Sequence, residues 1–115
     1  MAKTPNPNFM AGVPELLILQ LLQGNEMYGY EIVQAIYSRS GEVVSVGEGV
    51  VYPVLHMLEQ DGALSARRRT VAGRSRVYYR LTARGERRLG ALRHSWLSLN
   101  GAIAMVLGVG DARTI

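Results

Sequence analysis

Residues 64–81, LSARRRTVAGRSRVYYRL, decide the fold of this chain. β-branched and aromatic side chains recur in the segment, and residues of different character alternate along it, as they do in β-strands. A turn that includes Gly73 divides the segment into two strands. The alternation places Arg76, Tyr78 and Arg80 on one side of the second strand, and Val77, Tyr79 and Leu81 on the other. We therefore expect a β-hairpin with one side packed on a hydrophobic core.

Two helices are predicted near the start of the chain. Pro14 suits a first helical position and Gly24 a helix stop, which together predict a helix over residues 13–23. Leucine and isoleucine side chains occupy almost all sides of this helix, so we expect it to be buried on most sides. A second helix is expected over residues 28–40, with isoleucines four residues apart on its buried side.

A third helix is predicted between Gly47 and Gly62, which can cap its two ends. Ser45 and Glu48 have the spacing of a capping box and offer an alternative start. Helical spacing gives the helix one apolar side and one polar side. The apolar side consists of Val51, Val54, Leu55 and Leu58, and the polar side of Glu48, Tyr52, His56 and Gln60. The first side is expected to pack on the core and the second to contact a partner.

The predicted order of elements, three helices and then two strands, is that of a winged helix-turn-helix. The fold is thus expected to be mainly α with a small β-hairpin. The third helix takes the place of the recognition helix and the hairpin that of the wing. We divide the chain into a flexible leader (1–11), a winged helix-turn-helix DNA-binding domain (12–81), a C-terminal dimerisation helix (82–108) and a tail (109–115).

The C-terminal helix carries an apolar stripe. Thr82 can cap this helix, which is expected to continue to about residue 107. Its apolar side chains recur at steps of three and four residues, the spacing of a helix that packs lengthwise against another helix. A domain of this size cannot cover such a stripe alone, so we expect a homodimer. The expected dimer interface consists of Leu89, Leu92, Trp96, Leu99, Ile103 and Val106.

Charge is unevenly distributed along the 115 residues. The chain has a net charge of +4, but residues 1–63 carry −5 and residues 64–115 carry +9. Five arginines surround the hairpin turn with no acidic residue among them, which favours contact with a polyanion over a merely solvated surface. These candidate DNA-binding residues are Arg67, Arg68, Arg69, Arg74 and Arg76. For Arg84, Arg87 and Arg88, at the start of the last helix, DNA contact and simple solubility both stay open.

Composition excludes several kinds of chemistry. The chain has no cysteine and only two histidines, His56 and His94, which provides neither a Cys/His pair nor the clustered ligands of a metal site. It also lacks the motifs of a P-loop, a dinucleotide site or a serine hydrolase. We therefore predict a non-enzyme with no catalytic residue, metal or cofactor. No apolar run approaches the roughly 20 residues of a membrane span, and we expect the protein in the cytoplasm.

Three strings occur in a specific order: MYGYEI at 27–32, VVYPVLHMLEQDGAL at 50–64 and GRSRVYYRLTARG at 73–85. Together they resemble the PadR family of bacterial transcriptional regulators over most of the chain, and the single C-terminal helix resembles its smaller branch. The resemblance implies a homodimer that binds operator DNA, usually as a repressor, and that a small aromatic or drug-like effector releases. Ser75 and Val77 replace the usual proline and lysine of the family, and Val50 replaces a small polar residue.

Three further side chains are candidates for contacts. Tyr52 has the position of a DNA-contacting residue, or it packs under the hairpin. His56, one turn further along the same polar side, is a candidate only through this neighbour and is otherwise a surface residue. Trp96 either anchors the dimer interface or stacks, with its copy in the partner, on a planar effector. The two roles of Trp96 are compatible.

Two other functions fit the same elements. Winged helices also serve as protein-interaction modules, although a docking surface is usually mixed in charge with an apolar centre. The chain could instead bind DNA without regard to sequence, in which case its footprint would spread along any duplex. The uniformly basic hairpin favours an operator-binding regulator over the first alternative.

Overall fold

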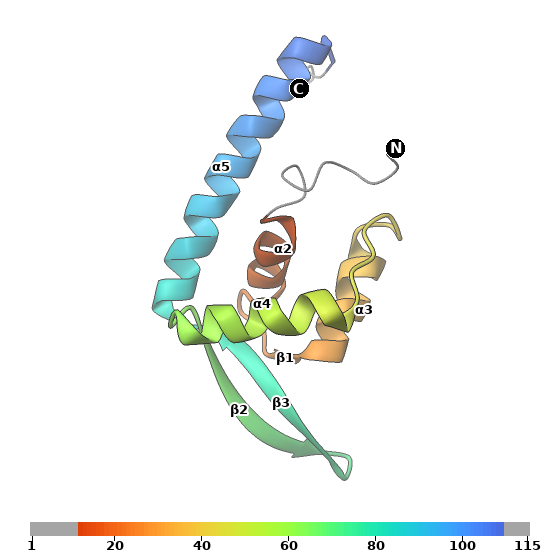
Figure 1. The fold of residues 1–115 in the computed structure, drawn as a ribbon, viewed down its shortest axis with the longest axis vertical. Helices are drawn as coiled ribbons and strands as arrows, with labels where there is room; N and C mark the ends of the chain where they lie inside the picture. Colours follow the sequence, from red (N-terminus) through yellow and green to blue (C-terminus); the bar gives the residue numbers. More distant parts are fainter. Residues whose placement is uncertain (1–11, 110–115) are drawn as a thin grey trace.

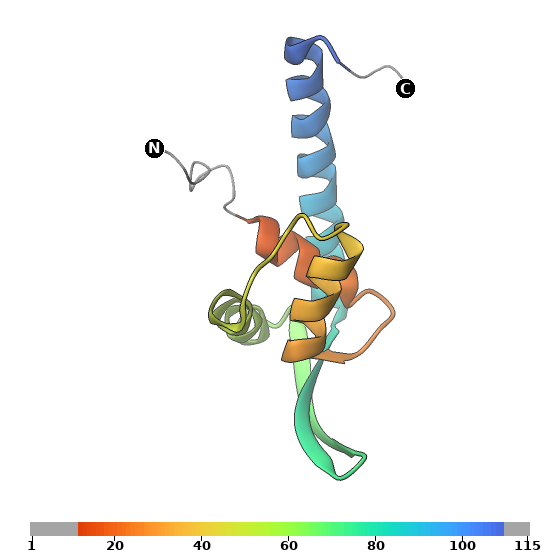
Figure 2. The same ribbon diagram turned by 90° about the vertical axis from the view of Figure 1, so that its right-hand side faces the viewer.

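The computed structural model describes residues 12–109. In this range, helices and strands follow in the order α2 (Val13–Leu21), β1 (Met27–Tyr28), α3 (Gly29–Arg39), α4 (Glu48–Gln60), β2 (Leu64–Val71), β3 (Arg74–Leu81) and α5 (Ala83–Leu107). The β2–β3 hairpin and α5 extend from opposite ends of a compact group formed by α2, α3 and α4 (Figures 1 and 2). This is the expected winged helix-turn-helix with a long C-terminal helix. The predicted leader (1–11) and nearly all of the tail (109–115) lie outside the described residues.

Helix α2 is the centre of the core. It begins after Gly12, which has the left-handed φ of 85° that glycine tolerates, and Pro14 occupies its first turn as predicted. Ile18 and Leu19 are completely buried. The helix ends at Leu21, two residues before the predicted end, because the chain turns there toward the sheet.

A short strand, β1, was not predicted. Its two residues pair with β3, with Met27 opposite Tyr79 and Tyr28 opposite Tyr78, so that the sheet has the order β1-β3-β2. The backbone N–H of Tyr28 donates to the Glu31 carboxylate at 3.1 Å, which caps α3. Helix α3 therefore begins at Gly29, one residue later than predicted.

Helix α4 packs on the core through the predicted apolar side. Val51, Leu55 and Leu58 are completely buried. Gly47 is the N-cap residue, so the helix uses this predicted alternative and not the Ser45–Glu48 capping box.

The hairpin has a two-residue turn, Ala72-Gly73, in which both residues have positive φ. Such turns match the twist of the flanking strands. Tyr79 packs in the core as expected. Tyr78, which the alternation places on the opposite side, is nevertheless buried because β1 covers it, and its ring meets that of Tyr28 edge to face at 5.3 Å.

Helix α5 is capped by Thr82, whose side chain accepts the N–H of Gly85 at 3.1 Å. The first part of the helix belongs to the protomer's own core: Leu89 is 1% exposed and Leu92 is partly buried. Beyond these residues the helix leaves the core, and Ile103 and Val106 are 38% and 88% exposed. The part of the predicted stripe that is open to a partner therefore begins after Leu92, and Leu89, which was predicted at the dimer interface, is buried within the protomer.

Candidate nucleic-acid interface

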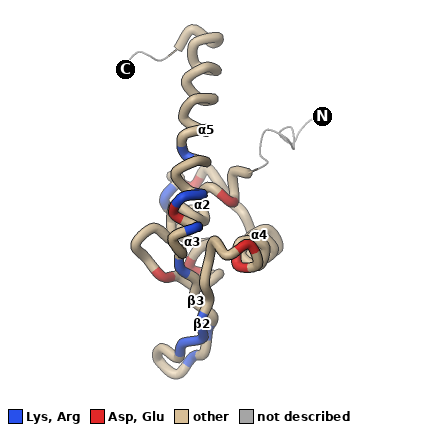
Figure 3. Tube along the Cα trace, turned by 90° about the vertical axis from the view of Figure 1, so that its left-hand side faces the viewer, with Lys and Arg blue, Asp and Glu red and all other residues tan. Residues whose placement is uncertain are grey.

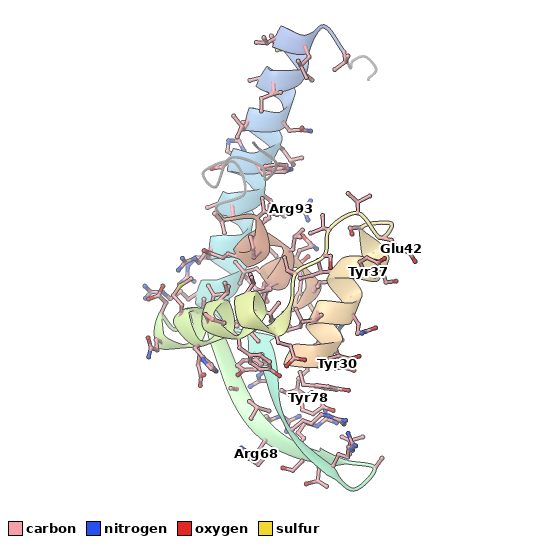
Figure 4. The ribbon with its side chains drawn as sticks, turned by 45° about the vertical axis from the view of Figure 1, so that its right-hand side comes forward. Tyr30, Tyr37, Glu42, Arg68, Tyr78 and Arg93 are labelled. Atoms are coloured by element: carbon pink, nitrogen blue, oxygen red, sulfur yellow. The ribbon has the colours of Figure 1, made fainter. Side chains whose placement is uncertain are left out.

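A groove separates α4 from the wing, by which we mean β2, β3 and their turn. Its volume is about 400 Å³. Figure 4 shows Tyr30 on the first turn of α3, close to the wing strands that carry Arg68 and Tyr78. The residues that line the groove are Tyr28, Tyr30, Tyr52, His56, Arg68, Ser75, Arg76, Val77 and Tyr79. Tyrosine, histidine and arginine side chains thus line one hollow.

Tyr52 is held in this groove by the close approach of two helices. Gly29, at the start of α3, is so near that a Cβ there would lie 2.7 Å from Cε1 of the Tyr52 ring and closer still to Cζ. The ring is half-buried and packs against the core. His56 is exposed one turn later, and the centroids of the two rings are 6.2 Å apart.

Two wing arginines belong to the groove. Arg68 pairs across the hairpin with Val77, and its guanidinium donates to the Ser75 hydroxyl at 3.2 Å. Arg76 is opposite Arg69 in the register and therefore projects from the other side of the sheet, although it also lines the groove. Its guanidinium lies over the Tyr28 ring, 4.4 Å from the centroid. Stacking leaves the edges of a guanidinium free to donate hydrogen bonds to an anion.

The side of the wing opposite Arg68, which is also the side of Arg76, carries an ion-pair cluster that the sequence did not reveal. Arg67 donates to both carboxylate oxygens of Glu26, at 2.8 and 3.1 Å, and Arg69 donates to one of them at 3.0 Å. The hydrogen bond from Arg67 lowers the pKa of Glu26, and the same bond raises the pKa of Arg67. Arg69 also lies over the Tyr78 ring at 4.4 Å. Two of the five candidate arginines are therefore matched with a carboxylate that comes from the segment before β1.

The remaining basic residues differ in their surroundings. Arg74 is exposed at the wing turn. Arg88 forms ion pairs with Glu15 of α2 and Asp61 at the end of α4, and its hydrogen bond to Glu15 raises its pKa. It therefore joins three helices, which gives it a structural role. Arg84 and Arg87 are exposed on the first turns of α5, where Figure 3 shows basic segments in addition to those of the wing.

Helix α4 itself contains no lysine or arginine, and its charged residues are Glu48 and Glu59. The cations of this surface thus come from the wing and not from the helix beside it.

A second hollow, of about 170 Å³, lies between the start of α2 and the middle of α5. Trp96 lines it together with Leu16, Leu92 and Leu99. The hollow is mainly apolar, and the Trp96 side chain is partly buried.

Residues 12–109 include no cluster of three or more histidine, aspartate or glutamate side chains placed to bind a metal ion. None of the helices in that range combines the length and the hydropathy needed to cross a membrane.

A helix-turn-helix whose second helix is exposed beside a basic β-wing defines the winged-helix class of DNA-binding proteins. Comparison with known proteins narrows this class. The chain belongs to the transcriptional regulator PadR-like family, whose sequence profile matches residues 18–91. It is thus a DNA-binding regulator of transcription, and its family is one of regulators and not of enzymes. The resemblance seen in the three sequence strings is confirmed.

Individual relatives support the assignment. The chain is 42% identical over 77 residues to the transcriptional regulator Rv3488 of Mycobacterium tuberculosis (strain ATCC 25618 / H37Rv). The aligned segment covers 67% of this chain and 69% of that protein. The structure of smu.1704 from Streptococcus mutans UA159 is similar with a TM-score of 0.76 and 32% identity, over 89% of this chain and 92% of the other. A transcriptional regulator from Clostridium thermocellum has a TM-score of 0.77 and 26% identity, over 85% and 96%.

Proposed function

We propose that the protein is a homodimeric repressor that binds operator DNA in the cytoplasm and is released by a small planar aromatic effector. In this proposal α4 of each protomer enters a major groove, and the wing holds the neighbouring phosphates. Two copies of α4 then contact half-sites about one helical turn apart, roughly 10 bp.

The observation that carries the proposal is the groove between α4 and the wing. Tyr52 and His56 of the helix and Arg68 and Arg76 of the wing line one hollow, although the two arginines project from opposite sides of the sheet. A phosphate backbone can enter this hollow. Arg74, exposed at the wing turn, adds a further positive charge near the end of the hairpin. By contrast, Arg67 and Arg69 bind Glu26, and we assign them a smaller share of the phosphate contacts than their charge suggests.

Dimerisation is supported by the second half of α5. Leu99, Ile103 and Val106 of the predicted stripe are 51%, 38% and 88% exposed in the single chain. At about 25 cal/mol for each Å² of apolar surface removed from water, a matching helix of a second copy would gain several kcal/mol by covering them. The protomer's own core offers no such cover, because α5 extends beyond it (Figure 1).

The effector site is proposed at Trp96. The hollow between α2 and α5 is apolar and is partly walled by the same helix that we assign to the dimer interface. A planar aromatic molecule that stacks on the indole would change the packing of α5, and with it the distance between the two α4 helices. The prediction to test is that such a molecule quenches Trp96 fluorescence and weakens DNA binding together.

Binding to the DNA upstream of the protein's own gene, mapped by protection from cleavage, tests the proposal directly. A protected palindrome supports it. A footprint that spreads over any duplex would indicate binding without regard to sequence, and no binding even at low salt would leave the protein-interaction alternative.

A salt titration measures the phosphate contacts. Of the five candidate DNA-binding arginines in each protomer, three, Arg68, Arg74 and Arg76, form no ion pair with a described carboxylate. If each neutralises one phosphate, the slope of log affinity against log salt should be about −5 for the dimer. A slope near zero would exclude the proposed mode of binding.

A further inference from the structure

The start of α4 has an unusual surface for a helix that reads DNA. In helix-turn-helix proteins, the N-terminal residues of the recognition helix contact base edges. Here the exposed residues in the first turns are Glu48, Gly49, Val50 and Pro53. None of these side chains is a hydrogen-bond donor, and the only polar group is a carboxylate, which accepts.

This composition excludes the commonest base contacts. Guanine is usually read by arginine or lysine, which donate to its O6 and N7, and adenine by asparagine or glutamine. Helix α4 has no arginine, lysine or asparagine, and its only glutamine is Gln60, its last residue. The first two turns of α4 therefore cannot read a purine through either contact.

An apolar surface is left in their place. Val50 is 44% exposed, although valine is normally buried, and Pro53 lies three residues later, next to it on the helix surface. Gly49 has no side chain, and a Cβ built there would meet nothing within 4 Å. The backbone at this end of the helix can thus come close to the floor of a groove, with Val50 and Pro53 at its edge.

In the major groove, the apolar feature that distinguishes one base from the others is the C5-methyl group of thymine. We infer that α4 recognises thymine in each operator half-site through contact of its methyl group with Val50, supported by Pro53. This inference rests on the proposed operator binding, since it names the base that the same surface prefers. The wing arginines supply affinity for any DNA, and the Val50 contact supplies a preference.

The test begins with the sequences that the full-length protein selects from a random DNA library. Each thymine of the selected half-site is then replaced by uracil, which removes only the methyl group. Burial of one methyl group is worth about 0.8 kcal/mol, so we expect affinity to fall about fourfold when one half-site is changed and about fifteenfold when both are. Replacement of the same thymine by 5-methylcytosine, paired with guanine, should lose less affinity than replacement by cytosine.

Variants of Val50 assign the effect to this residue. Val50→Ser should bind the uracil and thymine operators almost equally, whereas Val50→Thr, which keeps a methyl group and the branched shape, should retain part of the preference. Val43→Ser changes an 81% exposed valine outside α4 and should retain the whole preference.

The outcomes separate the two claims. If the protein binds no DNA, the proposed function fails. If it selects an operator but no uracil replacement weakens binding, or if Val50→Ser remains as sensitive to uracil as the original protein, the operator function stands and the thymine contact is refuted.

Discussion

Replacement of Gly29 by alanine tests whether the start of α3 holds the Tyr52 ring in the groove. The new Cβ would lie 2.5 Å from the Tyr52 hydroxyl oxygen and 2.7 Å from Cε1, far inside the normal contact distance of about 3.5 Å. The backbone of Gly29 follows directly on β1, which is paired with β3, so the ring and not the helix has to move.

The size of the effect follows from two opposing contributions. Overpacking of this kind costs about 1–3 kcal/mol, but the moving group is the far end of a side chain, which favours the lower half of that range. Alanine in place of glycine also gains up to about 1 kcal/mol inside a helix, and less at its first residue. We expect a net loss of about 0.5–1.5 kcal/mol, which lowers the Tm of a domain of this size by about 2–12 °C.

Urea denaturation of four proteins provides the assay: the original chain, Gly29→Ala, Tyr52→Ala and the double variant. Without the Tyr52 ring, Gly29→Ala has nothing to displace, so its cost should disappear or change sign. Gly90→Ala, in the interior of α5 where a Cβ would meet nothing within 4 Å, is the matched control and should be neutral or stabilising. The reasoning would be refuted if Gly29→Ala were as stable as the original chain, or if it cost the same in both backgrounds.

Three other changes have definite expectations. Glu26→Gln releases Arg67 and Arg69 and should make the salt dependence of DNA binding steeper. If one more phosphate is neutralised in each protomer, the slope of log affinity against log salt should become steeper by about 2. An unchanged slope would show that these arginines do not reach DNA. The pKa of Glu26 is lowered in the folded protein, so the stabilisation that its carboxylate provides is complete above about pH 4.5 and is lost as the pH falls through the lowered pKa. The stability of Glu26→Gln should therefore depend less on pH in that acidic range, which denaturation of both proteins at several pH values measures. Val106→Asp places a charge on an 88% exposed site and should yield monomers in sedimentation while the circular dichroism of the domain is retained. Gly85→Ala directs a Cβ into the backbone carbonyl of Ala63, which cannot turn away, and should cost more than about 3 kcal/mol in a denaturation experiment.

The helices and the hairpin were predictable because each has its own local pattern. Periodicity and caps located α2, α4 and α5, and the two-residue repeat located β2 and β3. For the predicted helices, the errors lay at their ends. At Leu21 and Gly29 the ends depend on how the chain reaches β1, which is a tertiary contact and leaves little trace in a local pattern.

Strand β1 and its consequences could not be predicted in this way. Two residues are too few to show a period, and Met27–Tyr28 form a strand only because β3 offers its free edge. The same contact places Glu26 next to arginines 41 and 43 residues away. The absence of acids around the hairpin in sequence therefore did not mean their absence in space.

The alternation of side chains along the wing strands could have separated Arg68 from Arg67 and Arg69, a difference that a simple count of arginines does not show. Side chains at successive positions point to opposite sides of a strand, so Arg68 had to lie on the side opposite Arg67 and Arg69. The cross-strand register then decides which side faces α4, and that register depends on the Ala72-Gly73 turn. With the turn known, Arg68 is distinguished from its two neighbours by position alone.

The wing carries arginines and α4 carries none, so affinity for DNA and preference for a base sequence depend on different elements. Contacts with phosphate are the same for every sequence, so changes to Arg68, Arg74 or Arg76 should weaken binding to all duplexes alike. Helix α4 contributes no cation, so changes at Val50 should alter which duplex is preferred while the salt dependence stays the same. A regulator built in this way can acquire a new operator through substitutions at the start of α4 without losing its hold on DNA, because the residues that provide affinity lie on a different element.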